Sequence, residues 1–430
     1  MHANFAIRYG RQLVRYNITS SVMTDVRVVA IVLLSVATAR AQPASLAGWD
    51  DGFFIQTADG TSRLTIGGYT QFDGRFFVAD SADPHVDQFG FRAIRPELKG
   101  TVLGHFDFRV LPDFAQGKTT IQDAYVEAHY GGLVRVRVGK FKVPFGLERL
   151  QRDVYTTFVE RGLPSLLAPN RDVGIAVFGE LAHGVVEYAL GVFDSVADNA
   201  SADGDTSDDK LGVARVFARP FARGPRLLQH LGVGVAGTYG WEHGTPASPL
   251  APTYVTQAQT TFFSYVDTVV STGLHWRASA QAYYFGGPLG VLAEYVHASQ
   301  HVGLAGSTED ASIDAWQGVV QWVITGEDAT YQSVAPARPF DPRTHDIGAV
   351  DFAARYGELA FADGTIFAGG YADPTRSARR ARSLGACVDW FPNKELRVAF
   401  DIEHTWYWLG AATGDRPPET SLIARVQTVF

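Results

Sequence analysis

Apolar and polar positions alternate with a period of two along most of the chain after residue 50. The alternation is clearest in HFDFRV (105–110), IQDAYVEAHY (121–130), LVRVRVGKF (133–141) and AVDFAARY (349–356). In the third of these, Val136 and Val138 fall on one face and Arg135 and Arg137 fall on the other. Such alternation predicts β-strands with one apolar and one polar face. We find no convincing amphipathic helix after residue 41.

The alternation predicts sixteen strands. They begin near Arg63, Phe89, Phe106, Thr119, Val134, Asp172, Val185, Leu211, Leu231, Trp276, Leu289, Ala315, Gly348, Ser383, Leu396 and Ser421. Tight turns at 130–132, 182–184 and 286–288 alternate with long connections at 194–210, 243–273 and 325–346. This alternation of tight turns and long loops is typical of an outer-membrane β-barrel. Aromatic clusters at 283–285 and 406–408 fit a girdle at the membrane interface.

The chain ends in a strand pattern, TSLIARVQTVF (420–430), in which Leu422, Val426 and Phe430 share one face and Arg425 lies on the other. Chain ends usually fray, so a strand that continues to the last residue needs a neighbour on each edge. A closed barrel provides both neighbours. We therefore expect an all-β fold, a 16-stranded antiparallel transmembrane outer-membrane β-barrel, with Arg425 facing its water-filled interior. A soluble β-sandwich or propeller is the alternative.

Residues 1–41 have the pattern of a secretory signal peptide. Arginines precede an apolar run over residues 28–39, and Ala39-Arg40-Ala41 fits the cleavage pattern. The run is shorter than the about 20 residues that a spanning helix needs, and a short membrane anchor is the alternative. The leader is long, which makes Met23 a second possible start. Cleavage after Ala41 would leave one undivided domain, residues 42–430, and change the formal net charge from −8 to −12.

Composition and motifs narrow the function classes. Apolar residues make up 46% and charged residues 19% of the chain, which is the composition of a folded protein. The single Cys387 excludes an internal disulfide and a multi-cysteine metal site. We find no convincing nucleophile motif, no phosphate-binding loop, no dinucleotide fingerprint and no basic patch for nucleic acid. The sequence therefore predicts neither an enzyme nor a bound cofactor or metal.

Six segments resemble, in this order, the phosphate-selective porin O and P family: GGYTQFDGRFF (67–77), FRAIRPELKGTVLGHFDFRV (91–110), QDAYVEA (122–128), VRVGKFKVPFGLE (136–148), LGACVDWFPNKELRV (384–398) and LIARVQTVF (422–430). The resemblance covers the chain from about residue 51 to its end. It implies a diffusion channel for small anions such as phosphate in the outer-membrane lipid bilayer of a Gram-negative bacterium. It also implies a homotrimer, and recognition of the strand ending at Phe430 by the barrel assembly machinery.

The resemblance further implies an anion site at a constriction. Arg92 matches the first arginine of an F-R-R motif, whereas Ala93 replaces the second, and Arg95 is a nearby substitute. Arg149 matches a basic residue that contributes to the site. Asp123 matches an acidic residue that, in the family, reduces the positive charge of the anion site.

The strand pattern predicts that Arg109, Arg135, Arg137 and Arg425 line the pore. Arg92 and Arg95 are three residues apart and cannot share a face of a regular strand. Either a β-bulge brings both inside, or one of them lies at the rim.

One departure from the family concerns the loop after the ninth strand, which carries an arginine-rich ladder in phosphate-selective members. Residues 244–273 contain no arginine and no lysine. Two alternatives therefore stand beside an anion channel. One is a general or weakly selective porin that has lost phosphate selectivity, and the other is a non-channel barrel with a structural or adhesive role.

Overall fold

The computed structural model describes residues 5–9, 12–16, 46–79, 86–204, 207–362 and 364–430. The strands are β1 (Phe5–Tyr9), β2 (Gln12–Tyr16), β3 (Leu46–Trp49), β4 (Phe53–Gln56), β5 (Arg63–Ala79), β6 (Gln88–Val102), β7 (Phe106–Asp113), β8 (Thr120–His129), β9 (Arg135–Lys142), β10 (Arg171–Leu181), β11 (Val186–Phe193), β12 (Leu211–Ala218), β13 (Leu231–His243), β14 (Thr253–Val255), β15 (Thr261–Ser264), β16 (Val270–Gly286), β17 (Leu289–Leu304), β18 (Ser307–Val323), β19 (Ala349–Phe361), β20 (Ala378–Phe391), β21 (Leu396–Ala411), β22 (Gly414–Asp415) and β23 (Glu419–Val429). The described residues also form three short helices: the 3-10 helices η1 (Glu148–Leu150) and η2 (Leu163–Leu167), and the α-helix α2 (Thr365–Ala368).

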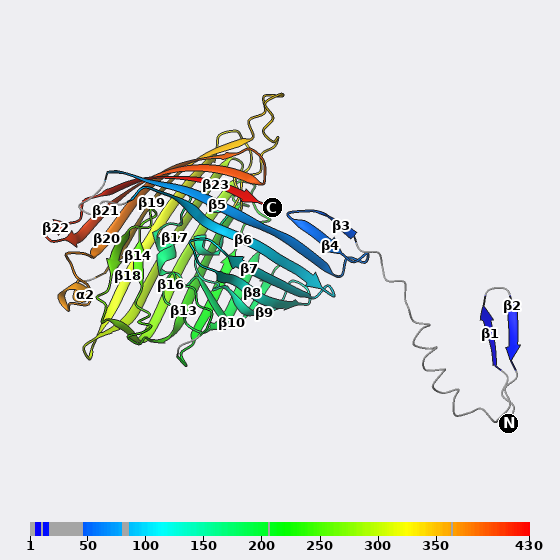
Figure 1. The fold of residues 1–430 in the computed structure, drawn as a ribbon, viewed down its shortest axis with the longest axis horizontal. Coiled ribbons are helices and arrows are strands. Elements are labelled where there is room, and N and C mark those ends of the chain that lie inside the picture. The colour runs from blue at the N-terminus through cyan, green and yellow to red at the C-terminus, as the bar shows by residue number, and fades with distance from the viewer. Residues whose placement is uncertain (1–4, 10–11, 17–45, 80–85, 205–206, 363) are drawn as a thin grey trace, which may run out of the picture.

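Sixteen strands form a closed antiparallel barrel (Figure 1). They run in sequence order from β5 to β23, and β23 pairs with β21 on one edge and with β5 on the other. The short strands β3, β4 and β22 extend this sheet, and β14 and β15 form a separate hairpin. The expected 16-stranded barrel is therefore confirmed, and most predicted strand starts lie within a few residues of the observed ones.

The two faces of the barrel wall differ in polarity as the alternation requires. In β23, the outward side chains Leu422 and Val426 are 40% and 46% exposed, whereas Arg425 between them is 3% exposed and points inward. The outward apolar side chains have no protein neighbour to cover them. They form the surface that a transmembrane barrel presents to lipid. Among the aromatic clusters expected in a girdle, Tyr283 and Tyr407 instead pack inside the barrel.

The last residue is held on the first barrel strand. The N–H group of Phe430 donates to the oxygen of Gly68 at 2.9 Å, and the N–H group of Gly68 donates to the oxygen of Phe430 at 2.7 Å. Gly68 has a φ of +152°, and a Cβ there would lie 2.5 Å from the Arg95 carbonyl oxygen. The seam of the barrel thus requires glycine at this position.

Connections alternate between the two ends of the barrel because its strands are antiparallel and follow in sequence order. One end, called the turn end, holds the connections 182–185, 287–288 and 392–395 and the C-terminal residue. The connection 324–348 joins β18 to β19 and lies at this same end. The sequence pattern grouped it with the long loops of the opposite end, which is wrong. Its length serves contacts inside the barrel, as described below.

The predicted signal peptide covers residues 1–41. Its apolar run and cleavage pattern lie outside the described residues, and β1 pairs with β2 in a separate two-stranded sheet. Across the described ranges, no helix is both long enough and apolar enough to cross a membrane.

We expect Gly68→Ala to weaken closure of the barrel. A side chain at this φ costs about 1–3 kcal/mol, and the new Cβ would also collide with the neighbouring strand. The measurement is the temperature at which the folded protein loses its fast migration in a denaturing gel, and it should fall. Gly90→Ala in β6 is the control, since a Cβ there has no atom within 4 Å. Equal behaviour of the two variants would contradict this account of the seam.

Candidate functional site

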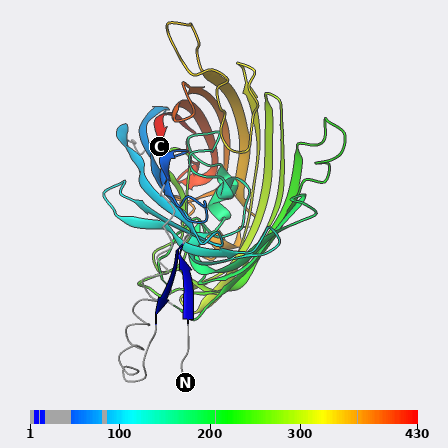
Figure 2. The same ribbon diagram turned by 90° about the vertical axis from the view of Figure 1, so that its right-hand side faces the viewer.

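The connection between β9 and β10 folds into the barrel and crosses it. This segment, residues 143–170, is called the inner loop and carries η1 and η2. In Figure 2 the teal segment that contains these helices lies inside the ring of strands. The inner loop makes hydrogen bonds to β19 and β21, on the opposite side of the barrel from β9 and β10, and to β5, β17 and β23 between them. It therefore narrows the interior.

Side chains of the barrel wall satisfy the backbone carbonyls of the inner loop. Arg355, Arg397 and Arg425 donate to loop carbonyl oxygens at 2.5–2.8 Å. Gln71 and Gln427 donate in the same way at 3.0 and 3.1 Å. Buried carbonyls of an irregular loop need such partners because they have no regular ladder to join. These three arginines therefore hold the loop.

Carboxylates of the wall accept hydrogen bonds from N–H groups of the inner loop. Glu294 on β17 accepts from Leu147 and Glu148 at 2.6 and 3.2 Å. Asp401 on β21 accepts from Val159 at 2.7 Å. The wall thus binds the loop through donors and acceptors together, which fixes its path.

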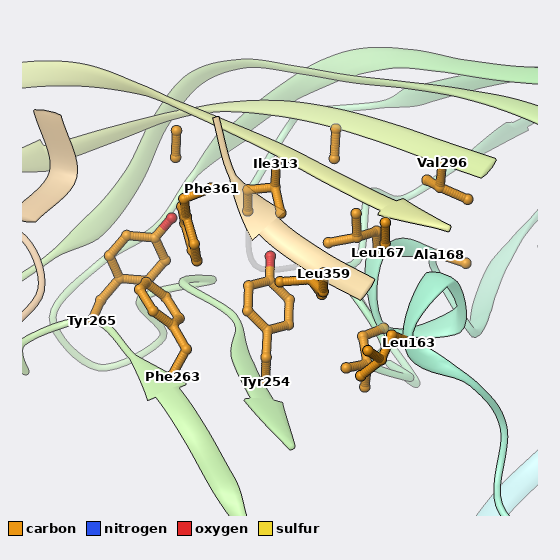
Figure 3. Close-up of a cluster of buried hydrophobic side chains, with 14 of the residues drawn as sticks. Leu163, Leu167, Ala168, Tyr254, Phe263, Tyr265, Val296, Ile313, Leu359 and Phe361 are labelled. Atoms are coloured by element: carbon orange, nitrogen blue, oxygen red, sulfur yellow. The ribbon is translucent and has the colours of Figure 1, made fainter. Parts of the chain in front are cut away.

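An apolar core fixes the other half of the inner loop. Leu163 and Leu167 of η2 lie beside Leu359 of β19, next to Tyr254 and Phe263 of the β14–β15 hairpin (Figure 3). All five side chains are at most 1% exposed. The hairpin belongs to the arginine-free connection between β13 and β16. This connection therefore folds inward and seals one side of the interior with apolar side chains.

A cavity of about 230 Å³ lies between the inner loop and strands β7–β12. Its charged lining residues are mainly basic: Arg109, Arg135, Arg137, Lys142, Arg152, Arg171 and Arg215, with the acidic residues Asp123, Asp153 and Glu187. We call the space bounded by these ten side chains the basic chamber. Four of the eight candidate residues, Arg109, Asp123, Arg135 and Arg137, lie together in its lining.

A β-bulge resolves the odd spacing of Arg92 and Arg95. The register between β5 and β6 shifts after Gln71, and Arg92 is the extra residue. A bulge turns the following side chains to the other face, so both arginines contact groups inside the barrel. Pro96 is tolerated in this central strand opposite Gly68, where the two backbones approach closely.

The guanidinium group of Arg92 is paired with a carboxylate of the inner loop. Glu160 accepts from Arg92 at 2.6 and 3.2 Å and from Arg75 at 2.6 Å, and Arg425 lies 3.6 Å from it. Arg425 also makes a two-point contact with Asp73 at 2.6 and 2.8 Å. Arg92 and Arg425 thus meet at a cluster in which three arginines face two carboxylates, Glu160 and Asp73.

Arg95 and Arg149 are enclosed by protein and are not in the lining of the basic chamber. Arg95 pairs with Asp113 at 2.7 Å and with Asp153. Arg149 lies on η1, where it donates to a carbonyl of η2 and to Oδ1 of Asn199 at 2.5 Å. Arg95 thus binds the inner loop from β6, and Arg149 binds groups that flank it from within the loop.

Arg109 and Asp123 are partners in the basic chamber. Asp123 lies 2.9 Å from Arg109 and accepts from Arg171 at 2.9 Å. Arg109 also reaches Glu97 at 2.6 Å. Asp123 therefore balances two cations of the lining. This agrees with the expectation that it reduces the positive charge of an anion site.

Arg135 and Arg137 differ in how far their charge is balanced. Arg137 binds Glu127 at 2.7 and 2.8 Å and stacks over the Tyr125 ring at 4.1 Å. Arg135 reaches the same carboxylate only at 3.8 Å, and its side chain is 37% exposed. Arg135 is thus the more available of the two for a passing anion.

Six further charged residues of the chamber were not found from the sequence. They are Lys142, Arg152, Asp153, Arg171, Glu187 and Arg215. Arg171 and Arg215 open or lie within strands, where alternation places them inward. Arg152 and Asp153 lie in the irregular inner loop, and no periodicity indicates the direction of their side chains.

The connection 324–348 reaches the inner loop from the turn end. The hydroxyl of Tyr331 donates to the oxygen of Leu147 at 2.6 Å, and Gln151 Nε2 donates to the oxygen of Tyr331 at 2.8 Å. The Tyr331 ring stacks on Tyr283 of β16 with centroids 5.3 Å apart. This connection therefore supports the inner loop from the turn end of the barrel.

A family model described as phosphate-selective porin O and P matches residues 65–407. The chain belongs to this family. It is an outer-membrane porin that forms a channel. No curated protein sequence matches the chain at a significant level.

Solved structures of other porins share the fold. The outer membrane channel DcaP of Acinetobacter baumannii has a TM-score of 0.57 and 11% identity, and covers 90% of this chain and 100% of its own. An anion-selective porin from Comamonas acidovorans has a TM-score of 0.53 and 11% identity, with 86% and 100% covered. The trimer form of OmpT from Vibrio cholerae has a TM-score of 0.53 and 9% identity, with the same coverage. At these identities the likeness concerns the fold.

We expect Tyr331→Ala to loosen the inner loop of this porin. The change removes the hydrogen bond to Leu147 and a large ring from a packed site, and such deletions typically cost about 3–5 kcal/mol. Single-channel recordings should show frequent transitions between conductance levels that the unmodified porin lacks. Tyr331→Phe keeps the ring and loses one hydrogen bond worth about 1 kcal/mol, so its recordings should be nearly unchanged. A steady current in both variants would contradict a supporting role.

Proposed function

We propose that this porin is a passive diffusion channel that favours small anions, phosphate among them. The observation that carries the proposal is the lining of the basic chamber, in which seven basic side chains face three acidic ones. Glu97 and Glu127 are not in the lining, but they pair with Arg109 and Arg137 and balance part of this charge. An excess of cations remains.

Guanidinium groups suit this task. They stay charged at every working pH, and their planar fork matches carboxylate and phosphate oxygens. Several such groups in a narrow space raise the local concentration of anions. Conduction is kept fast when the ion moves between several moderate sites instead of one deep site. The partly balanced arginines of the chamber fit that requirement.

The net charge of −12 expected for residues 42–430 does not oppose this proposal. Much of the negative charge is carried elsewhere, for example in the connection 194–210, which holds six aspartates and one lysine. Charges beyond about 8 Å are largely screened at physiological salt. Selectivity then depends on the groups that line the narrow part.

A weakly selective porin is the second candidate. The observation that favours it is the connection between β13 and β16, which folds inward through apolar contacts and brings no basic side chain into the interior. Phosphate would then meet fewer basic side chains on its way to the basic chamber. The two candidates share the path and differ in how strongly phosphate is held.

We further propose the assembly and export route that the family resemblance implies. The chain would be exported with cleavage near Ala41, inserted by the barrel assembly machinery through the strand that ends at Phe430, and assembled as a homotrimer in a Gram-negative outer membrane. The trimer form of the OmpT neighbour supports the last step. The role remains passive transport, without an enzymatic step.

The test is the zero-current potential of the purified porin in a planar bilayer under a KCl gradient. We expect the sign for chloride preference, and a reduced chloride current when phosphate is added. Arg135→Gln should lower the chloride preference because it removes a cation of the lining that is 37% exposed and reaches its carboxylate partner Glu127 only at 3.8 Å. Arg343→Gln is the control, since Arg343 is 88% exposed in the connection 324–348 and pairs with Asp341 there.

The outcomes separate the candidates. Chloride preference without a phosphate effect would select the weakly selective porin. Cation preference, or an equal effect of the two variants, would contradict the proposed role of the basic chamber.

A further inference from the structure

A carboxylate of the inner loop, Asp153, occupies a cage of cations at the wall of the basic chamber. Arg161 donates to it at 2.7 Å, Lys142 at 3.3 Å, Arg95 also donates to it, and Arg171 lies 3.9 Å away. The side chains of the four cations are 5–18% exposed. The carboxylate is therefore held by groups that the fold has largely removed from water.

The contacts of Asp153 are those that a small oxyanion would need. Arg161 and Lys142 donate to one oxygen, and Arg95 and the hydroxyl of Tyr69 donate to the other. Phosphate and carboxylate ions accept such charge-assisted hydrogen bonds from guanidinium and ammonium groups. The cage is thus an oxyanion site whose ligand is part of the chain.

The cage stays positively charged with its own carboxylate in place. Besides Asp153, two carboxylates contact it: Asp113 on Arg95 and Asp123 on Arg171. Four cations therefore face three anions. Burial would raise the pKa of Asp153, but Lys142, Arg161 and Arg95 outweigh burial and hold that pKa well below its usual range. These three cations therefore stabilise the ionised form of Asp153.

We propose that Asp153 is a built-in counter-anion that fills an oxyanion site and thereby sets the selectivity of the channel. With the site filled, a passing anion meets a wall with moderate positive charge and moves on. With the negative charge at position 153 removed, inorganic phosphate would compete with the neutral side chain for the same cations, bind there and obstruct the path. The inference rests on the proposed passage of anions through the basic chamber, and it assigns selectivity to a residue of the inner loop.

The backbone at this position has its own support. Gln71 Nε2 donates to the carbonyl oxygen of Asp153 at 3.0 Å, and Gln427 Nε2 donates to the next carbonyl, that of Val154, at 3.1 Å. Asp153→Asn therefore removes the charge while these anchors stay. The shape of the side chain is also preserved.

The inner loop offers a matched control in Glu160. It is a second loop carboxylate held by arginines, Arg75 and Arg92, each at 2.6 Å. It does not line the basic chamber. Glu160→Gln thus makes the same charge change on the same loop, away from the cavity.

The experiment records chloride current through the full-length D153N, E160Q and unmodified porins while inorganic phosphate is added. We expect half-block of D153N at a phosphate concentration at least about tenfold lower than for the unmodified porin. The reason is that the cations that donate charge-assisted hydrogen bonds to the Asp153 carboxylate would donate them to phosphate instead. E160Q should resemble the unmodified porin.

A second readout covers the case in which D153N assembles poorly. A ligand that binds only the folded state stabilises it, so phosphate should raise the temperature at which folded D153N loses its fast gel migration. Phosphate should leave E160Q and the unmodified porin unchanged. The inference is overturned if D153N shows neither effect, or if E160Q shows both to the same extent. The unmodified porin's zero-current potential is read separately, so failure of the proposed anion preference and failure of this inference are distinguishable.

Discussion

The constraint on which the structure depends is the hydrogen bonding of an irregular loop inside a membrane-spanning barrel. A strand wall satisfies its own backbone, whereas the inner loop has no ladder to join. The wall supplies side chains instead: arginines and glutamines for the carbonyls, and carboxylates for the N–H groups. Removing one such partner leaves a buried polar group, which typically costs about 1–3 kcal/mol. The loop, and with it the narrow part of the channel, is fixed by this network.

This network divides the interior into two functional parts. On the side of β17–β23, cations such as Arg355 and Arg397 are used to hold the loop, and an apolar core with the β14–β15 hairpin closes much of the remaining space. On the side of β7–β12, the arginines are balanced by carboxylates only in part and face a cavity. An arginine inside a barrel is therefore not by itself an ion site. Its role depends on whether backbone or open space faces its guanidinium group.

The sequence predicted the barrel well because each strand repeats one local rule, with a period of two, and because the terminal strand at 420–430 needed partners on both edges. The same alternation directed Arg109, Arg135 and Arg137 toward the interior. The inner loop could not be predicted in the same way, since the directions of Arg152 and Asp153 follow from tertiary contacts. Arg92, Arg95 and Arg149 were expected to bind anions, but the structure pairs them with Glu160, Asp153 and Asn199. The loop sequence shows no period that would reveal such pairing.

The most direct test of the central claim is the position of anions inside the unmodified porin. Crystals soaked in bromide and measured at its absorption edge would show each bound ion through its anomalous scattering. The account predicts bromide in the basic chamber, between the inner loop and β7–β12, close to Arg135. Bromide confined to the opposite wall, beside Arg355 and Arg397, would contradict it, because those arginines would then be free to bind ions and the inner loop would need other support.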